Sequence, residues 1–389
     1  MRNRIGARIW FGIGLLAIAV GVPALNNGLQ FGLVRDEELF WEGILHFSGH
    51  PHPTLELIRN LPLPHTPLLY IFWGYFERWT QSAVIAGRWI NWAATLATLV
   101  LIAMPFHLSR GKAALGLLLC PYFIFTGYHL YTDPIPNFIG LLAVVFHFRK
   151  NFGASAVMSV LAISMRQYLF VVPAALLMYE IWGPSPNRPK NSARWMAPLI
   201  GCLTLFAWFL VYGGKFGPES SAIFMDEKIT IHPDYSLYGL ACIGLYYFVF
   251  EFMLWPRSFE IEHSKRNIAI VLGLALLFLA FPPLQNHMLP PTMGALDVAA
   301  RVYLPWDPLR IAFFWSLACL AAIRLLREPR GFAFWLVLIH IAILATQKST
   351  WDKYALPVLV LLWFNRRSAS DYDRGAELPA GVSATTRSK

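Results

Sequence analysis

Residues 153–182 read GASAVMSVLAISMRQYLFVVPAALLMYEIW, two apolar runs that meet at Arg166 and Gln167. Basic clusters flank this stretch, with Lys150 before it and Arg188 after it. One tilted helix fits between the clusters, and so do two short helices that turn at Arg166. Only two helices keep every later basic cluster on one side of a membrane, as loop charges of membrane proteins favour. We therefore interpret the stretch as two membrane helices.

Apolar runs of this kind recur along the whole chain of 389 residues. Apolar residues make up 57% of it and charged residues 14%, whereas a soluble domain carries roughly a quarter charged residues. Most of the surface therefore faces something other than water. The runs are about 15 to 24 residues long, enough or nearly enough to cross a bilayer. They predict about twelve helices, near residues 9–25, 83–106, 113–130, 134–148, 153–165, 168–182, 195–212, 236–255, 267–281, 309–323, 331–346 and 354–364.

The predicted fold is an all-α, polytopic transmembrane bundle in a single domain, residues 1–367. The tail 368–389 is rich in small and polar residues, which predicts a disordered cytoplasmic segment. Alternate connections between the runs hold the basic clusters, and both termini fall on that side, which we assign to the cytoplasm. The remaining connections, among them 26–82, 213–235 and 282–308, hold most acidic residues. Function is therefore expected at the extracytoplasmic face, periplasmic or luminal.

Composition also argues against other classes of protein. The formal net charge is +10, but no basic stretch is long or interleaved with aromatic residues, so a nucleic-acid partner is not expected. The four cysteines lie inside apolar runs without metal-binding spacing, which argues against a disulfide scaffold or a zinc site. No clear metal ligand set stands out, no cofactor is expected, and metal dependence stays open.

The first outer segment carries two candidate interfacial helices. Arg35 to Leu45 reads RDEELFWEGIL, an amphipathic run with too many charges to cross a bilayer. A proline-rich turn at 61–67 follows, and then the short apolar run 68–76. The next cytoplasmic cluster is reached only after 83–106, so one run must not cross, and the shorter run 68–76 is the better candidate for an interfacial or re-entrant helix.

Several outer residues are candidates for chemistry, and each also has a plainer interpretation. Asp36, Glu37 and Glu38 form a solvated flank or a helix cap, or one of these carboxylates is a catalytic base. Arg166 is a snorkelling arginine, or it binds phosphate through its planar fork of donors. Asp133 precedes Pro134 and fits the N-cap of a helix.

Three further candidates lie in the outer loops. Lys215 follows Gly213 and Gly214, which would let a backbone approach a ligand. Lys353 lies in Trp-Asp-Lys-Tyr before the last helix, where an interfacial anchor with a local charge pair is the plain interpretation. His65 and the other histidines of the first outer segment are interpreted as surface residues.

Together these groups match the needs of sugar transfer from a lipid phosphate. The leaving phosphate is already anionic, so cationic side chains can stabilise the charge that it gains. The acceptor is a hydroxyl and needs a carboxylate base within hydrogen-bond reach. The same groups also occur in many transporters, so they are necessary for this function without being specific to it.

Arg35-Asp36-Glu37 is similar to the Asp-Glu pair in the first luminal loop of GT-C class glycosyltransferases. The stretch 63–70, LPHTPLLY, with Arg88 in the next span, is similar to the second interfacial helix of that class and the helix after it. Three further motifs resemble the dolichyl-phosphate-glucose α-1,2-glucosyltransferase family over roughly residues 9–255: the Tyr-Thr-Asp turn at 131–133, the Arg-Gln turn at 166–167 and the glycine-rich loop 213–221. That loop matches only in part, because Pro218-Glu219 replaces the family's order. The chain is shorter than expected for the eukaryotic enzymes, which suggests a prokaryotic-like relative.

The resemblance implies a hexosyltransferase that moves a hexose, glucose first among the candidates, from a polyprenyl-phosphate donor to a glycan or glycolipid acceptor, with inversion. Asp36 would be the general base and Glu37 would orient the acceptor or share that role. Arg166 and Lys215 would bind the donor phosphate. The remaining substrate-binding residues would be Asp133, Gln167, His65 and Lys353. The bilayer and its lipid-linked donor are the expected partners.

Two other classes of protein stay open at this point. A transporter or flippase for lipid-linked sugars shares the span count and an outer cavity, although no internal repeat is visible. A structural or assembly protein would not need Asp36, Arg166 and Lys215 to converge. The arrangement of these residues in the fold separates the alternatives.

Overall fold

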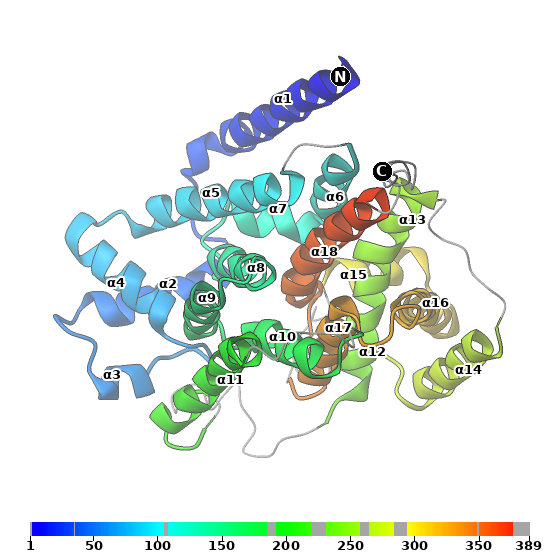
Figure 1. The fold of residues 1–389 in the computed structure, drawn as a ribbon. Helices are drawn as coiled ribbons and strands as arrows, with labels where there is room; N and C mark the ends of the chain where they lie inside the picture. Colours follow the sequence, from blue (N-terminus) through cyan, green and yellow to red (C-terminus); the bar gives the residue numbers. More distant parts are fainter. Residues whose placement is uncertain are drawn as a thin grey trace, which may run out of the picture.

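A computed structural model describes residues 2–34, 36–104, 108–184, 192–215, 217–218, 231–256, 264–283, 294–347 and 350–375. All the regular elements in these ranges are helices, so the all-α prediction is confirmed for them (Figure 1). The α-helices are α1 Arg2–Leu25, α2 Asp36–Ser48, α3 Leu55–Arg59, α4 Leu68–Thr80, α5 Ala83–Ala103, α6 Leu108–Leu118, α7 Pro121–Gly127, α8 Pro134–Phe148, α9 Phe152–Met165, α10 Val171–Trp182, α11 Ala193–Val211, α12 Pro233–Ile243, α13 Phe250–Leu254, α14 Lys265–Ala280, α15 Ala295–Tyr303, α16 Asp307–Leu325, α17 Phe332–Leu344 and α18 Leu356–Gly375. Shorter 3₁₀ turns are η1 Asn27–Leu29, η2 Gln167–Phe170 and η6 Asp352–Ala355, and η4 Gly244–Val249 is a π-helical turn.

Several helices are apolar enough to lie in a bilayer. Within the described ranges, four are also long enough to cross one: α5, α11, the continuous run from Pro233 to Leu254, and α16. Five shorter apolar helices accompany them. Large apolar side chains on α11 and α14 are exposed, among them Leu203, Phe206 and Leu276. Apolar faces of this extent are typical of a surface that meets lipid, so the fold is compatible with membrane insertion.

The stretch 153–182 forms two helices, as predicted. Arg166 has extended backbone angles, φ −154° and ψ 106°, which end α9 before η2 and α10 begin. Helix α9 packs beside α8 and α11. The turn at Arg166 therefore returns the chain through the bundle instead of continuing one tilted helix.

Three predicted boundaries differ from the structure. The run 113–130 is divided at Pro121, which lacks an N–H group and leaves Cys120 extended at ψ 111°. The segment 282–308, predicted to lie outside, contains α15, whose nine residues are too few to form an apolar run of spanning length. Helix α18 continues past Arg367 to Gly375, beyond the predicted start of the tail at residue 368. Residues 376–389 lie outside the described ranges.

Polar contacts between connections fall into two groups at opposite ends of the bundle. At one end, which we call the Asp36 end, Asp36 pairs with Lys353, and Thr66 N donates to Gln167 Oε1 at 3.0 Å. At the other end, which we call the Arg324 end, Arg324 and Arg366 pair with Glu251. Helices such as α8, α10 and α18 run from the first end to the second. Arg324 and Arg366, which were predicted to lie on one side of the membrane, therefore share a carboxylate partner.

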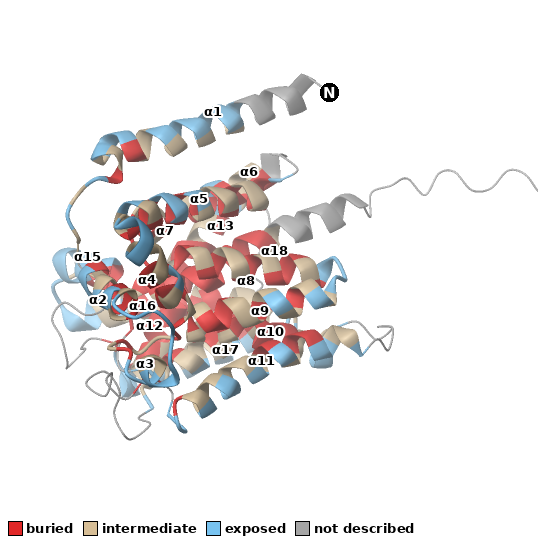
Figure 2. Ribbon diagram, turned by 90° about the vertical axis from the view of Figure 1, so that its left-hand side faces the viewer, coloured by how far each residue is buried: buried red, intermediate tan, exposed pale blue. Residues whose placement is uncertain are grey.

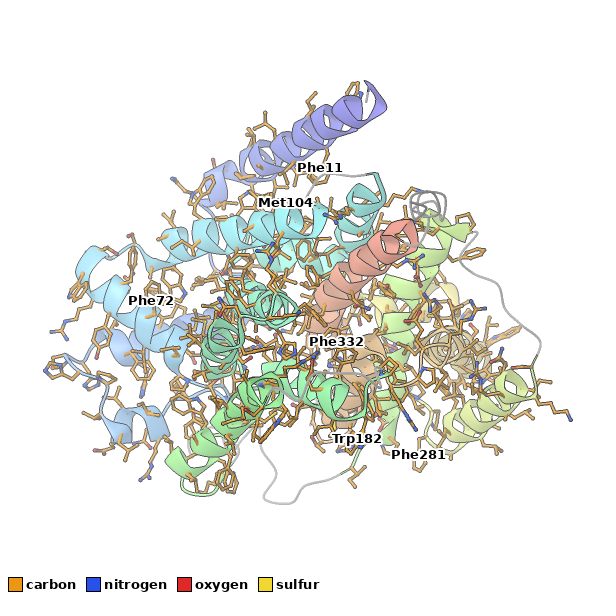
Figure 3. The ribbon with its side chains drawn as sticks, in the orientation of Figure 1. Phe11, Phe72, Met104, Trp182, Phe281 and Phe332 are labelled. Carbon is orange, nitrogen blue, oxygen red and sulfur yellow. The ribbon has the colours of Figure 1, made fainter. Side chains whose placement is uncertain are left out.

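The core lies between the helices of the main body, whereas α1 stands at its edge with mostly exposed or half-buried residues (Figure 2). One large apolar cluster joins α6, α8, α12, α16 and α18. Phe332, the first residue of α17, packs edge-on to Phe148 and Tyr179, with ring centroids 5.7 and 6.2 Å apart, whereas Phe72 and Phe281 lie at the periphery (Figure 3).

A second apolar cluster supports the Asp36 end. It joins α2 and α4, the two helices predicted to be interfacial, through Phe40, Ile44, Tyr70 and Trp73. The helices touch at Gly74, where an added Cβ would lie 2.6 Å from Phe47 Cβ. The first turn of α2, with its three acidic residues, lies outside this apolar cluster.

We predict opposite stability changes for two helical glycines. An added Cβ at Gly244 would collide with the backbone carbonyl of Leu317, whereas one at Gly273 meets nothing within 4 Å. Gly244→Ala should therefore reduce the free energy of unfolding by about 1–3 kcal/mol through overpacking. Gly273→Ala should raise it by about 0.5–1 kcal/mol, because alanine is the better helix former. Thermal unfolding in detergent measures both, and equal effects would contradict the close contact between η4 and α16.

Candidate functional site

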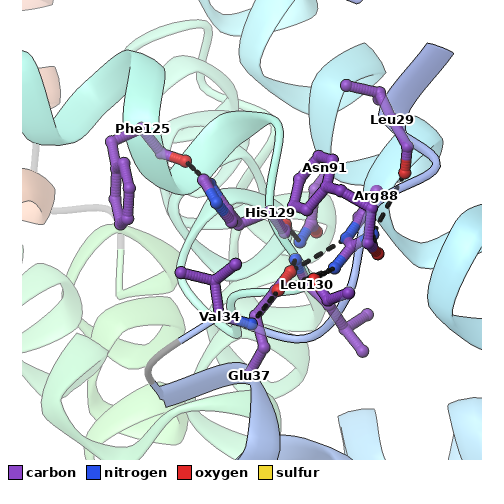
Figure 4. A network of polar contacts seen from close by, with 10 residues as sticks. Leu29, Val34, Glu37, Arg88, Asn91, Phe125, His129 and Leu130 are labelled. Carbon is purple, nitrogen blue, oxygen red and sulfur yellow. Dashed lines mark hydrogen bonds and ion pairs between the residues drawn. The ribbon is translucent and has the colours of Figure 1, made fainter. Parts of the chain in front are cut away.

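A completely buried ion pair joins the start of α2 to α5. Glu37 and Arg88 are each 0% exposed, and their two contacts measure 3.0 Å from Nε to Oε1 and 2.7 Å from Nη2 to Oε2 (Figure 4). The remaining donors of Arg88 reach the carbonyls of Leu29, Phe31 and Gly32 at 2.7–3.1 Å. All five N–H groups of the guanidinium therefore have acceptors, as a buried arginine requires.

Glu37 also holds two backbone segments. Its Oε2 accepts from Val34 N at 2.9 Å, and its Oε1 accepts from Leu130 N at 2.5 Å. The carboxylate thereby connects the segment before α2 with the turn before α8. Both oxygens are occupied and buried, which favours a structural role for Glu37 beside Asp36. Its expected share in catalysis or in orienting the acceptor stays a prediction.

Asp36, the first residue of α2, has a different partner. Its Oδ2 accepts a hydrogen bond from Lys353 Nζ in an ion pair that joins residues 317 positions apart. The Asp36 side chain is 26% exposed and that of Lys353 is 7% exposed, whereas Glu38 is exposed. Three consecutive acidic residues therefore differ in environment, and only Asp36 combines a cationic partner with access for another molecule.

Aromatic rings surround the Lys353 ammonium. Its Nζ lies 5.0 Å from the ring centroid of Trp351, 5.3 Å from that of Tyr131 and 5.9 Å from that of Tyr354. These distances suit cation–π attraction, which is stronger where water is excluded. The lysine is therefore held in a half-closed aromatic setting, with Asp36 as the carboxylate that compensates its charge.

Asp352 anchors the backbone from which Lys353 extends. The Asp352 carboxylate is 0% exposed and accepts from Tyr238 Oη at 2.5 Å, Tyr246 Oη at 2.8 Å and Leu296 N at 2.8 Å. It thereby joins η6 to α12, η4 and the first turn of α15. The plain interpretation of Asp352 and Lys353 as a local charge pair is wrong, because the two side chains have separate partners.

Arg166 is buried beside the same end of the bundle, with unused hydrogen-bonding capacity. It is 2% exposed, its Nη2 lies 3.4 Å from Asp133 Oδ1, and its Nε and Nη1 have no hydrogen-bond partner. Asp133 is 1% exposed, accepts from Tyr168 Oη through Oδ1, and has no partner for Oδ2. Buried donors and acceptors without partners carry a desolvation cost, so they mark a place where a polar ligand would be stabilised.

His65 and Gln167 shape the loop between these charges. Gln167 accepts from Thr66 N and donates to the carbonyl of Pro64, so it clamps the loop 61–67 against η2. His65 Nδ1 lies 2.6 Å from Tyr70 Oη. Burial, with smaller contributions from Arg166 and then Lys353, lowers the pKa of His65 well below its usual value, so the imidazole is neutral at pH 7.

The structure brings most of the predicted site residues together. Phe40 lies within 5.8 Å of His65, Tyr131 and the Arg166 guanidinium, measured between ring centroids or to Cζ, and Tyr131 contacts Lys353. Arg166, Asp133, His65, Lys353 and Asp36 therefore surround one small region at the Asp36 end.

Lys215 is not placed in this group. It is exposed beyond the end of α11, where Tyr212 donates from its hydroxyl to the His65 carbonyl at 3.2 Å. Residues 216 and 219–221 of the glycine-rich loop, and also Arg35, lie outside the described residues. The predicted role of Lys215 as a phosphate ligand stays a prediction.

Sequence reasoning missed four residues that complete the region. Tyr168, Tyr238 and Tyr246 bind the two buried aspartates, and Phe40 packs between the charged groups. A tyrosine in an apolar helix resembles any core aromatic residue, so only the three-dimensional contacts identify its role. Asp352 had a usable signal, since an acidic residue beside an apolar run requires partners.

Within the described ranges, no group of three His, Cys, Asp or Glu side chains is placed to hold a metal ion. Comparison with known proteins finds no matching family model, no matching curated protein and no matching solved structure.

We predict that two neighbouring acidic residues differ sharply in their effect on stability. Glu37→Gln leaves the buried Arg88 charge uncompensated, which should lower the free energy of unfolding by about 3–5 kcal/mol. Glu38→Gln changes an exposed side chain and should stay within about 0.5 kcal/mol of the parent protein. Denaturation in detergent micelles measures the difference, and similar stabilities for the two variants would contradict the Glu37–Arg88 clamp.

Proposed function

We propose that the protein is a GT-C-like membrane glycosyltransferase. It would move a hexose, with glucose as the first candidate, from a polyprenyl-phosphate donor to a hydroxyl of a lipid-linked glycan or another extracytoplasmic acceptor. The observation that supports this most directly is the meeting of one accessible carboxylate, Asp36, with two cations, Lys353 and Arg166, at one end of an apolar helical bundle.

Arg166 is the best candidate for the donor phosphate. Its Nε and Nη1 have no partner, and a guanidinium donates charge-assisted hydrogen bonds to phosphate oxygens. Asp133 Oδ1 lies at 3.4 Å and compensates part of the charge while leaving these donors unused. A buried anion with several acceptor oxygens would therefore satisfy groups that the protein alone leaves unpaired.

Asp36 is the best candidate for the general base. It is the only one of three consecutive acidic residues that is both accessible and fixed by a partner. Glu37 and Arg88 fix the turn of α2 that carries it, so the carboxylate is preorganised for an acceptor hydroxyl. His65, being neutral, can exchange hydrogen bonds with sugar hydroxyls without adding charge to the site.

The setting of the site suits an amphiphilic donor. Helices α2 and α4 are short and flank the Asp36 end, whereas apolar helices such as α11 expose side chains along the body. Basic residues gather at the Arg324 end, which supports a cytoplasmic position for that end and an extracytoplasmic position for the site. A polyprenyl chain would then lie in the bilayer while its phosphate reaches Arg166.

The proposed reaction is a single displacement. The acceptor oxygen forms a bond to the anomeric carbon as the bond from that carbon to the phosphate oxygen breaks, and the electron pair leaves with the phosphate. The hydroxyl proton passes to Asp36. Attack from the face opposite the leaving group inverts the anomeric carbon.

The first test is transfer from a panel of radiolabelled polyprenyl-phosphate sugars to membrane lipid extract. We expect a new labelled product with the parent protein and with Glu38→Gln, the matched control. Asp36→Asn keeps the size of the side chain and removes its basicity, so its rate should fall by roughly 10²–10⁴-fold. Normal turnover of Asp36→Asn would exclude it as the base. Binding without transfer across the panel would favour a transporter or flippase for lipid-linked sugars.

Arg166 gives a second prediction, for donor binding. Loss of charge-assisted hydrogen bonds costs about 1.5–3 kcal/mol, so Arg166→Met should weaken binding of polyprenyl phosphate by roughly 10-fold to 150-fold. Arg149→Met, at an exposed position near the Arg324 end, is the control. Titration of purified protein in nanodiscs measures both dissociation constants, and unchanged affinity in Arg166→Met would remove the guanidinium from the donor site.

A further inference from the structure

We infer that the Lys353 ammonium exchanges its ion-pair partner during each transfer, from the Asp36 carboxylate to the departing phosphate. This inference rests on the proposed function. In the structure the ammonium forms an ion pair with the Asp36 carboxylate. When Asp36 takes the acceptor proton, the ammonium becomes available to the new phosphate charge. Lys353 would thus be a ligand whose partner depends on the protonation of the base.

Two ion pairs lie in the region. Asp36 and Lys353 form one ion pair, and Asp133 and Arg166 form another. The second pair is buried, with exposures of 1% and 2%, so its carboxylate is not open to an acceptor. The Asp36 carboxylate is the accessible anion of the set, and Lys353 is the cation that compensates it.

The proposed reaction moves one negative charge from Asp36 to the phosphate. A polyprenyl-phosphate sugar is a phosphodiester with one negative charge, and its loss of the sugar leaves a monoester with a second ionisable oxygen. The acceptor proton neutralises Asp36 as the bond from the anomeric carbon to the phosphate oxygen breaks. One negative charge therefore disappears at Asp36 while one appears on the phosphate. An unpaired charge is costly where water is partly excluded. The ammonium is therefore stabilised when it pairs with the new negative charge on the phosphate.

Lys353 combines a fixed backbone with a flexible side chain. Its neighbour Asp352 is bound by Tyr238, Tyr246 and Leu296 N, which fixes the backbone of η6. The lysine stem has four methylenes and its ammonium has three donors that can rotate. A fixed backbone with a flexible stem lets Nζ exchange one oxygen partner for another without movement of the helices.

The aromatic rings support the same role. Trp351, Tyr131 and Tyr354 lie 5.0–5.9 Å from Nζ and offer attraction that does not depend on the protonation of Asp36. These rings would hold the ammonium in the region between its two partners. The described contacts of Nζ include no carboxylate besides that of Asp36.

The inference predicts that Asp36 restrains binding of the product. While Asp36 is ionised it holds the ammonium, so polyprenyl phosphate must compete for Lys353. Asp36→Asn releases the ammonium and should tighten binding of polyprenyl phosphate by about tenfold, equivalent to about 1.4 kcal/mol. In the Lys353→Met protein, Asp36→Asn removes only the repulsion between the Asp36 carboxylate and the phosphate. The affinity for polyprenyl phosphate should therefore rise by no more than about threefold.

The test is a double-mutant cycle of polyprenyl phosphate affinity in nanodiscs, with Asp36→Asn, Lys353→Met and the double variant. Glu38→Gln and Lys265→Met are controls at exposed positions and should bind like the parent protein. Lys353→Arg keeps the charge and serves as the second lysine variant should Lys353→Met fail to fold. With arginine at this position the tightening by Asp36→Asn should persist.

The outcomes separate the inference from the function beneath it. An equal gain in affinity with and without Lys353, or no gain in either, overturns the exchange of partners by Lys353 while leaving the phosphate site intact. Failure of the parent protein and of every variant to bind polyprenyl phosphate overturns the proposed function and the inference with it.

Discussion

The buried pair of Glu37 and Arg88 is the constraint on which the Asp36 end depends. Two charges that have left water are stable only while both remain paired and hydrogen-bonded. Their hydrogen bonds reach the segment before α2, helix α5 and the turn before α8, so these pieces take one arrangement. The position of Asp36, one residue earlier, follows from this arrangement.

The carboxylates discussed above differ in burial and in number of partners. Glu37, Asp352 and Glu251 are fully buried and bind several partners, so they hold helices in place. Asp36 is open to a second molecule and has one cationic partner. Burial and the number of partners therefore distinguish these three structural carboxylates from Asp36, the proposed base.

The sequence predicts the helices well where apolar runs have clear limits, as with α8, α9 and α17. It fails where a single residue changes the backbone, as Pro121 does, or where a helix is short and amphipathic, as α15 is. For the site, charged residues between apolar runs identify Arg166, Asp133 and Lys353 as candidates. Their partners could not be predicted, because the Asp36–Lys353 and Tyr238–Asp352 contacts join positions far apart in the chain.

The central claim is that Arg166 and Lys353 flank a phosphate site beside Asp36. An electron cryomicroscopy structure of the protein in nanodiscs with bound polyprenyl phosphate tests it most directly. The account predicts phosphate density in contact with the Arg166 guanidinium, within reach of Lys353 Nζ, and with the prenyl chain leading into the bilayer. Phosphate bound at the Arg324 end, or on a surface away from both residues, would contradict it.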